Sequence, residues 1–333
     1  MATLSTSALT LADWAKRLDP DGKVPSIVEL LSQTNEILLD MLWLQGNLPT
    51  GHRTTVRTGL PTVAWRLLNG GVTPSKSTTA QIDEQCGILE AWSEVDVALA
   101  KLNGNVGEFR ASEAKAFIEA MNQEMASTLF YGNSGTAPEE FTGLAPRYSA
   151  ISGATNAQNV ITGSGSGSDN SSIWLVGWGE NTISGIFPKG SKAGLEHNDY
   201  NEVTVEVTAG VAGNRMRAYQ ERFVWNAGIA LKDWRYVVRI PNIDVSNLVA
   251  NSSAADLVNL MIKATHRIPS LNMCKPVFYM NRTCFQMLDI QRREDVVTGG
   301  LTYAEVDGKR VASFRGIPIR ICDALTETEA AVS

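Results

Sequence analysis

Cysteine and histidine are scarce in this chain of 333 residues. The four cysteines are widely spread and none belongs to a CxxC pair, which argues against a disulfide framework and indicates buried thiols in a reducing compartment. The three histidines, His52, His197 and His266, show no H-x-x-x-H spacing and none lies near a paired cysteine. The sequence therefore predicts no metal site.

The chain also lacks an excess of positive charge and any long apolar run. The formal net charge is −6, and charged residues make up only 19% of the chain. A dedicated nucleic-acid-binding protein would show a basic surface instead. No stretch approaches the roughly 18 apolar residues of a membrane span, and residues 1–10 are too polar for a secretory signal. We expect no membrane contact and no sequence-specific binding of nucleic acid.

Two stretches resemble catalytic motifs, but their residues stand in the wrong order. Residues 190–192 read Gly-Ser-Lys, whereas a phosphate-binding loop needs Gly-Lys followed by Ser or Thr. Residues 163–168 alternate glycine and serine and lack the Gly-x-Ser-x-Gly register of a nucleophile elbow. His197 is the most tempting catalytic candidate, but a polar loop histidine is the simpler interpretation. The sequence predicts no catalytic or cofactor-binding residue, and hence no enzyme.

The first hundred residues predict an arm, a helix and a long hairpin. Residues 1–24 are typical of an extended arm, and Pro25 begins a helix whose apolar spacing continues to Gly46. Alternating apolar side chains predict strand segments at residues 54–58, 63–67 and 95–99. The hairpin tip, near residues 69–82, is polar and irregular. A hairpin without a core is marginal alone, so we expect it to lie against another surface.

The middle of the chain contains the clearest helix, at residues 110–131. Ser112 is its expected N-cap and Gly132 its end. The glycine–serine run at residues 163–168 is expected to be a flexible surface link.

The remainder alternates strands and short helices, with a hairpin turn at Asp307-Gly308. Strands are expected at residues 174–178, 183–187, 203–207, 223–225, 234–240, 276–280, 303–306, 310–314 and 317–321. Helices are expected at residues 254–266 and 282–292.

Aromatic and basic side chains on the arm, the hairpin and one helix end are the candidate contacts between subunits. Aromatic side chains often anchor protein interfaces, although most of the other tryptophans are expected in the core. Arg292-Arg293 is as well explained by a solvated, mixed-charge helix end. The candidate contact residues are Trp14, Arg57, Trp65, Arg66, Lys76, Trp92, Arg292 and Arg293.

Four strings, in this order, carry a family resemblance. They are Phe141–Leu144 after the long helix, Ser172–Gly194 with its Trp-Leu-Val-Gly-Trp, Pro276–Phe285 with Met-Asn-x-x-Thr, and Phe314–Leu325 with Gly-Ile-Pro-Ile. Together with the order of elements, they resemble the HK97-type major capsid protein of tailed double-stranded DNA bacteriophages. The second string is similar to capsid proteins of short-tailed, podovirus-type phages in particular.

The resemblance implies an α+β, HK97-like capsid fold whose subunits form hexamers and pentamers of an icosahedral shell around the phage genome. Such a protein would be part of the virion and would be assembled in the cytoplasm of the host bacterium. The implied parts are an N-terminal arm with the first helix (1–47), an extended β-hairpin loop (48–102), a peripheral domain with the spine helix and a strand-rich region (103–245), an axial domain (246–315), and a closing strand with the C-terminal tail (316–333).

Two departures from the family pattern bear on the expected partners. Only about 24 residues precede the first expected helix, so we expect a separate scaffolding protein, beside a portal, in place of a cleaved scaffolding segment. The founding family member joins a loop lysine to an asparagine of its neighbour. Here Lys76 is the only lysine between Lys23 and Lys101, and no asparagine follows Asn281. We therefore expect a non-covalent shell, with a cement protein as a further partner.

Two other interpretations remain open at this point. A cellular shell of the same fold, similar to an encapsulin, would enclose a cargo enzyme instead of DNA, and net charge does not separate the two. An unrecognised β-rich hydrolase is the third interpretation, and it would need serine, histidine and aspartate side chains gathered in a pocket.

Overall fold

The computed structural model describes residues 33–102, 105–206, 215–250, 254–294, 301–306 and 309–333. The described helices are α2 (Ile37–Asp40), α3 (Val97–Lys101), α4 (Val106–Tyr131), α5 (Leu144–Arg147), α6 (Val245–Ala250), α7 (Leu257–Thr265) and α8 (Arg282–Glu294). The described strands are β1 (Trp43–Gln45), β2 (Gly51–Gly59), β3 (Thr78–Asp96), β4 (Asn170–Trp178), β5 (Ile183–Phe187), β6 (Leu195–Glu206), β7 (Arg215–Leu231), β8 (Val237–Asp244), β9 (Lys275–Met280), β10 (Leu301–Val306), β11 (Lys309–Phe314) and β12 (Ile317–Ile321).

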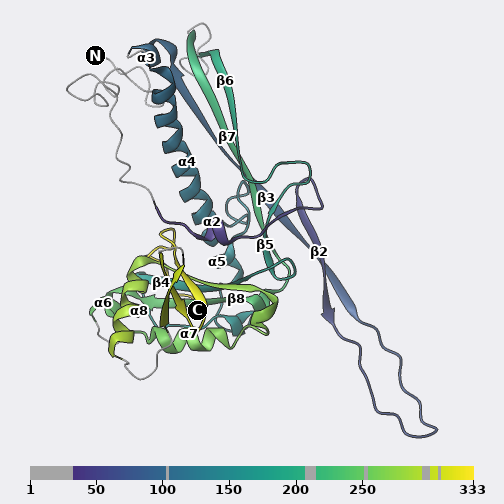
Figure 1. The fold of residues 1–333 in the computed structure, drawn as a ribbon. Coiled ribbons are helices and arrows are strands. Elements are labelled where there is room, and N and C mark those ends of the chain that lie inside the picture. Colours follow the sequence, from purple (N-terminus) through teal and green to yellow (C-terminus); the bar gives the residue numbers. More distant parts are fainter. Residues whose placement is uncertain (1–32, 103–104, 207–214, 251–253, 295–300, 307–308) are drawn as a thin grey trace.

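A compact lobe is built around β4 (Figure 1). Strand β4 pairs antiparallel with β8 on one side and with β9 on the other. Successive side chains of a strand point to opposite faces of its sheet. Trp174 and Val176 belong to one apolar core, whereas Ile173 and Leu175 belong to a second core that includes side chains of α6, α7 and α8. Every residue of β4 is buried, because both faces of the sheet are covered.

An elongated part rises from this lobe. Strand β7 pairs antiparallel with β3, β5 and β6, and α4 packs along β3 and β7 (Figure 1). The two parts of the sheet meet at one residue pair, Trp178 and Ile183. The predicted spine helix of residues 110–131 is present but begins earlier, at Val106. Asn105 occupies the N-cap position, so Ser112 lies inside the helix and its predicted capping role is wrong.

The expected helix from Pro25 to Gly46 is wrong where the structure describes it. Helix α2 is only four residues long, and the backbone turns extended at Met41. Strand β1 then pairs parallel with β5. Apolar spacing does not show where this helix ends, because Ile37 in the helix and Met41 after it both belong to the same apolar core.

The hairpin is present, but its strands differ from those expected. Residues 63–67 form no strand. Val97 and Leu99 start helix α3 instead of continuing the returning strand, because Asp96 caps that helix and accepts a hydrogen bond from the Ala98 N–H. The inner half of β3, from Cys86 to Asp96, pairs with β7. The outer half of the hairpin therefore pairs with no strand outside the hairpin.

The C-terminal elements agree well with expectation. Strands β9 and β12, helices α7 and α8, and the β10–β11 hairpin are all confirmed. The turn at residues 307–308 lies outside the described residues. Trp234 belongs to a 3-10 turn and not to a strand. Sheet pairing of β4 with β9 crosses the expected boundary at residue 245, so the division into domains stays a prediction.

The glycine–serine run at 163–168 is held more firmly than a free link. The N–H groups of Gly163 and Gly165 donate to the carbonyl oxygens of Pro241 and Asn242, at 2.8 and 2.7 Å. An added Cβ at either glycine would lie 2.7 Å from the Asn242 oxygen, so the sequence here fits close backbone approach.

Candidate assembly interface

The outer hairpin, residues 51–85, extends away from the rest of the chain (Figure 1). Strands β2 and β3 pair from Gly51 opposite Gln85 to Gly59 opposite Thr78, with an irregularity near the end. Arg53 and Asp83 form an ion pair at 2.6 Å across the strands. On this stretch β3 is mostly exposed, whereas β2 alternates between half-buried and exposed residues. Backbone pairing and not a core therefore holds the stretch together.

The tip of the hairpin, residues 60–77, presents large apolar side chains to solvent. Val63 is 91% exposed, Trp65 is fully exposed and Leu68 is 93% exposed. The chain turns at Asn69, whose φ of 63° is in the left-handed region that asparagine tolerates, and the Gly70 N–H donates to the Leu67 oxygen. Exposed apolar groups gathered in this way mark a contact surface.

The outer hairpin is also positively charged in an acidic protein. Between Thr54 and Ile82 the charged residues are Arg57, Arg66 and Lys76, with no aspartate or glutamate. Arg57 lines a cavity of about 680 Å³ between β2 and residues 232–235. This stretch therefore offers both apolar area and unneutralised positive charge to a partner.

The structure gathers four of the predicted contact residues on the outer hairpin and separates the others. Arg57, Trp65, Arg66 and Lys76 lie there. Trp92 lies on the inner half of β3, where it stacks on Tyr200 and lies under the Arg222 guanidinium. Trp14 lies outside the described residues, and for Arg292 and Arg293 only the backbone, in α8, is described. Their role as contacts stays a prediction.

His197 has a structural explanation. Its Nε2 lies 2.9 Å from Glu221 Oε2, and its ring stacks on Phe223. Arg110, from α4, contacts Glu221 and Asp199, so these charges fasten the spine helix to the β6–β7 pair. Burial acts to raise the pKa of Asp199, but hydrogen bonds from the Asn201 N–H and from Arg110 lower it overall.

The buried ion pair between Arg239 and Glu329 was not expected from the sequence. Its atoms lie 2.9 Å apart and both side chains are only 6% exposed. Tyr131 and Ser172 donate to Glu329, and the Arg239 guanidinium lies over the Trp174 ring. No local pattern marks this pair, because the two residues are 90 positions apart.

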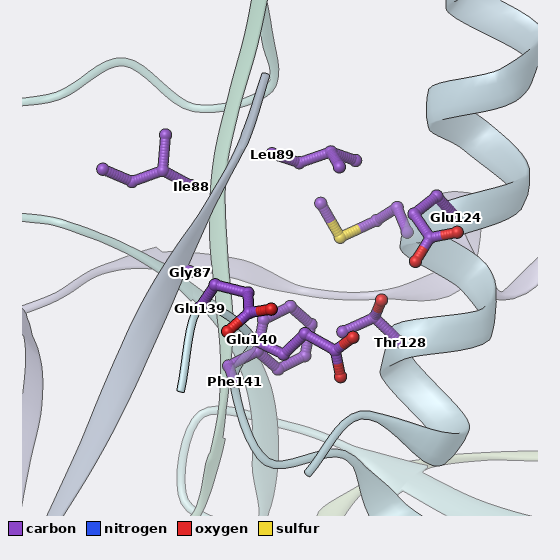
Figure 2. A pocket seen from close by; sticks show the side chains of 9 residues that line it. Gly87, Ile88, Leu89, Glu124, Thr128, Glu139, Glu140 and Phe141 are labelled. Atoms are coloured by element: carbon purple, nitrogen blue, oxygen red, sulfur yellow. The ribbon is translucent and has the colours of Figure 1, made fainter. Parts of the chain in front are cut away.

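A small cavity beside the spine helix was also missed. It has a volume of about 170 Å³ and lies between β3, the C-terminal half of α4 and residues 139–141 (Figure 2). Its lining comes from three separate segments, so no motif could reveal it. Among the described residues, no group of histidine, cysteine, aspartate or glutamate side chains could hold a metal ion. No helix that the structure describes is long and apolar enough to cross a membrane.

A projecting hairpin, a long helix packed along an extended sheet, and a compact lobe of sheet and helices define an α+β shell protein of the HK97-like class (Figure 1). The chain belongs to the family of the major capsid protein GP7, whose model matches residues 19–333. It is thus a major capsid protein of a tailed bacteriophage and a component of the virion.

A solved structure of bacteriophage Epsilon15 is similar over 100% of this chain and 99% of that chain, with 33% sequence identity and a TM-score of 0.79. These matches confirm the predicted resemblance to capsid proteins of short-tailed phages. The capsid of a native GTA particle has a TM-score of 0.45 at 10% identity. The SrpI encapsulin of Synechococcus elongatus PCC 7942 has 0.42 at 11%. Likeness this weak supports no functional conclusion. No curated protein matches the sequence.

Proposed function

We propose that this major capsid protein assembles as hexamers and pentamers into an icosahedral shell around the double-stranded DNA of its phage, in the cytoplasm of the host bacterium. The observation that carries the proposal is the outer hairpin with its exposed apolar tip. A surface of this kind is a liability in a free subunit and becomes useful when a neighbour covers it.

The shape of the contact favours rings. A projecting hairpin and the surface that receives it are different patches, which allows the contact to repeat head-to-tail from copy to copy. Such contacts close into rings when the rotation between copies allows it. Hexamers and pentamers are rings of this type, and five- and six-fold rings together can tile a closed shell.

The partners that follow are other copies of the chain, a separate scaffolding protein, a portal and a cement protein. The DNA would be enclosed without sequence-specific binding. The net charge of −6 also disfavours tight contacts with its phosphates, which need positive charge. The role is structural and not enzymatic, since the family is a structural one and His197 is engaged with Glu221.

Electron microscopy of the purified protein, beside its sedimentation profile, tests this function. We expect closed shells, tubes, or rings of five and six. Native particles should contain double-stranded DNA and not a cargo enzyme. A subunit that stays monomeric at high concentration and with its scaffolding protein would contradict the proposal.

A further inference from the structure

A polar cavity lies beside the outer hairpin, between β2 and the turn that follows β7. Its volume is about 680 Å³. Residues 54–60 form one wall, and Asn181 together with residues 232–235 forms the other. One water molecule occupies about 30 Å³ in the liquid. The space is therefore sufficient for a hydrated ion of several atoms.

The wall formed by β2 is a free edge of the sheet. Strand β2 ends the order of paired strands, and β3 is its partner. The outward N–H groups of such an edge have no strand to which they can donate. The Thr54 hydroxyl belongs to this wall, is buried, and has no hydrogen-bond partner among the described residues. Sheet edges can form anion-binding concavities, because their N–H groups point into one space.

The charges that line the cavity are mainly positive. Arg57 is exposed on β2, and Lys232 is half-buried on the opposite wall. Among the described residues, no ion pair involves either of them. The one carboxylate among the lining residues, Asp233, is paired with Arg235 at 2.7 Å. The lining thus has two positive charges that no carboxylate of the lining neutralises.

We propose that this cavity binds a small multivalent oxyanion, such as pyrophosphate, between Arg57 and Lys232, with the Thr54 hydroxyl and the β2 edge as further donors. Hydrogen bonds from a charged donor to an anion are about twice as strong as neutral ones. An anion with two charged groups can contact both walls at once, which a chloride ion cannot. The proposal does not depend on the shell function, because both walls belong to one chain.

Isothermal titration calorimetry of the purified protein with sodium pyrophosphate tests the proposal. At about 0.15 M salt, which screens exposed charges, we expect one ion per chain with a Kd of about 1 mM or tighter. Inorganic phosphate should bind more weakly, because it has less charge and reaches only one wall. Absence of pyrophosphate binding under these conditions would overturn the proposal.

Variants with an equal loss of charge locate the site. Arg57→Gln and Lys232→Gln should each weaken pyrophosphate binding at least about tenfold, since each removes a charge-assisted contact. The matched control is Lys76→Gln, which removes a positive charge from the same hairpin but outside the cavity lining, and it should bind like the parent. Circular dichroism checks that each variant is folded. Equal affinities for all three variants would place the ion elsewhere and overturn the proposal.

Amide hydrogen exchange gives an independent readout. Pyrophosphate should slow exchange most in residues 54–60, which border the cavity, and much less in α7. An effect in residues 54–60 no larger than in α7 would count against this site. A DNA duplex is the second source of phosphate groups to be titrated. Binding of the duplex that depends on Arg57 and Lys232, without any binding of pyrophosphate, would assign the cavity to the genome and overturn the proposal.

Discussion

At the scale of single residues, the C-terminal segment is fastened by charges buried inside the lobe. Glu329 accepts hydrogen bonds from Tyr131 and Ser172 and pairs with Arg239. Burial, together with the nearby Glu329 charge, raises the pKa of Tyr131, so its hydroxyl stays protonated and donates. The Glu329 carboxylate is thus the shared hydrogen-bond and ion-pair partner of these three side chains, and its removal would leave them buried without that partner.

Glu329→Ala should therefore destabilise the subunit strongly. Loss of one member of a buried ion pair costs about 3–5 kcal/mol, because the remaining charge stays desolvated. Chemical denaturation of purified subunits measures the free energy of unfolding. The control is Glu180→Ala on the exposed surface, expected within about 0.5 kcal/mol of the parent. Equal stabilities for the two variants would contradict the role given to Glu329.

Asp323 provides a pH-dependent contact for the N-terminal segment. The Arg282 side chain donates to its carboxylate at 2.7 and 2.9 Å, and the Thr34 N–H donates to the same group. The Arg282 hydrogen bond is the main reason that the pKa of Asp323 lies below its ordinary value of 3.8. A lowered pKa in the folded state stabilises the protein above the ordinary pKa, and this contribution is lost as the pH falls through the lowered value.

Below about pH 4, we expect the midpoint temperature of thermal unfolding to decrease, partly because Asp323 becomes protonated. The Asp323→Asn variant should be less stable at neutral pH and should lose less on acidification, because its amide does not titrate. Thermal unfolding followed from pH 3 to pH 7 measures both effects. Parallel pH profiles for the variant and the parent would argue against this contact as the source.

At the scale of elements, the hairpin has two halves with different partners. The inner half of β3 is paired with β7 along eleven residues, Cys86–Asp96, and belongs to the folded body. The outer half is paired only with β2, and its tip contributes no side chain to any apolar core of the described residues. Folding of the subunit and contact with neighbours are thus assigned to different halves of one element.

Replacing residues 60–77 with an Asn-Gly turn should separate these two roles. Gly59 lies opposite Thr78, so a two-residue turn can join the strands. We expect the subunit to keep its circular dichroism spectrum and its unfolding midpoint and to lose ring and shell formation. Sedimentation velocity reports the assembly state. Normal shells from the shortened protein would show that the tip is dispensable.

At the scale of the whole molecule, the shell is expected to be held without covalent links. Lys76 is the only lysine of the outer hairpin, and no asparagine occurs after Asn281. Many modest contacts, including the hairpin tip, must then add up to hold the particle.

Virions boiled in denaturant should therefore give a single capsid band near 36.1 kDa. The expectation follows from the absence of a matched lysine–asparagine pair. The gel should be run with and without reductant, because all four cysteines are free in the subunit. Ladders of linked subunits that survive reduction would contradict a non-covalent shell.

The sequence by itself determined the family and the order of most elements after residue 105. Period-two alternation in the buried strands, helical spacing in residues 110–131, and turn residues between them report local burial, which each segment carries in its own side chains. Local spacing could not show that the chain turns extended at Met41, since the pairing of β1 with β5 decides this. Nor could it show that α3 replaces the end of the returning strand.

Only the tertiary structure decided what lies next to what. The Arg239–Glu329 pair, the Arg110–Glu221 contact and the cavity beside the spine helix all join segments that are far apart in the chain. Such contacts depend on how strands and helices pack, and no residue type or spacing specifies them in advance. The physical reason is that the pattern of apolar residues within a segment indicates which of its side chains are buried. Which side chains contact one another depends on the geometry of the whole fold.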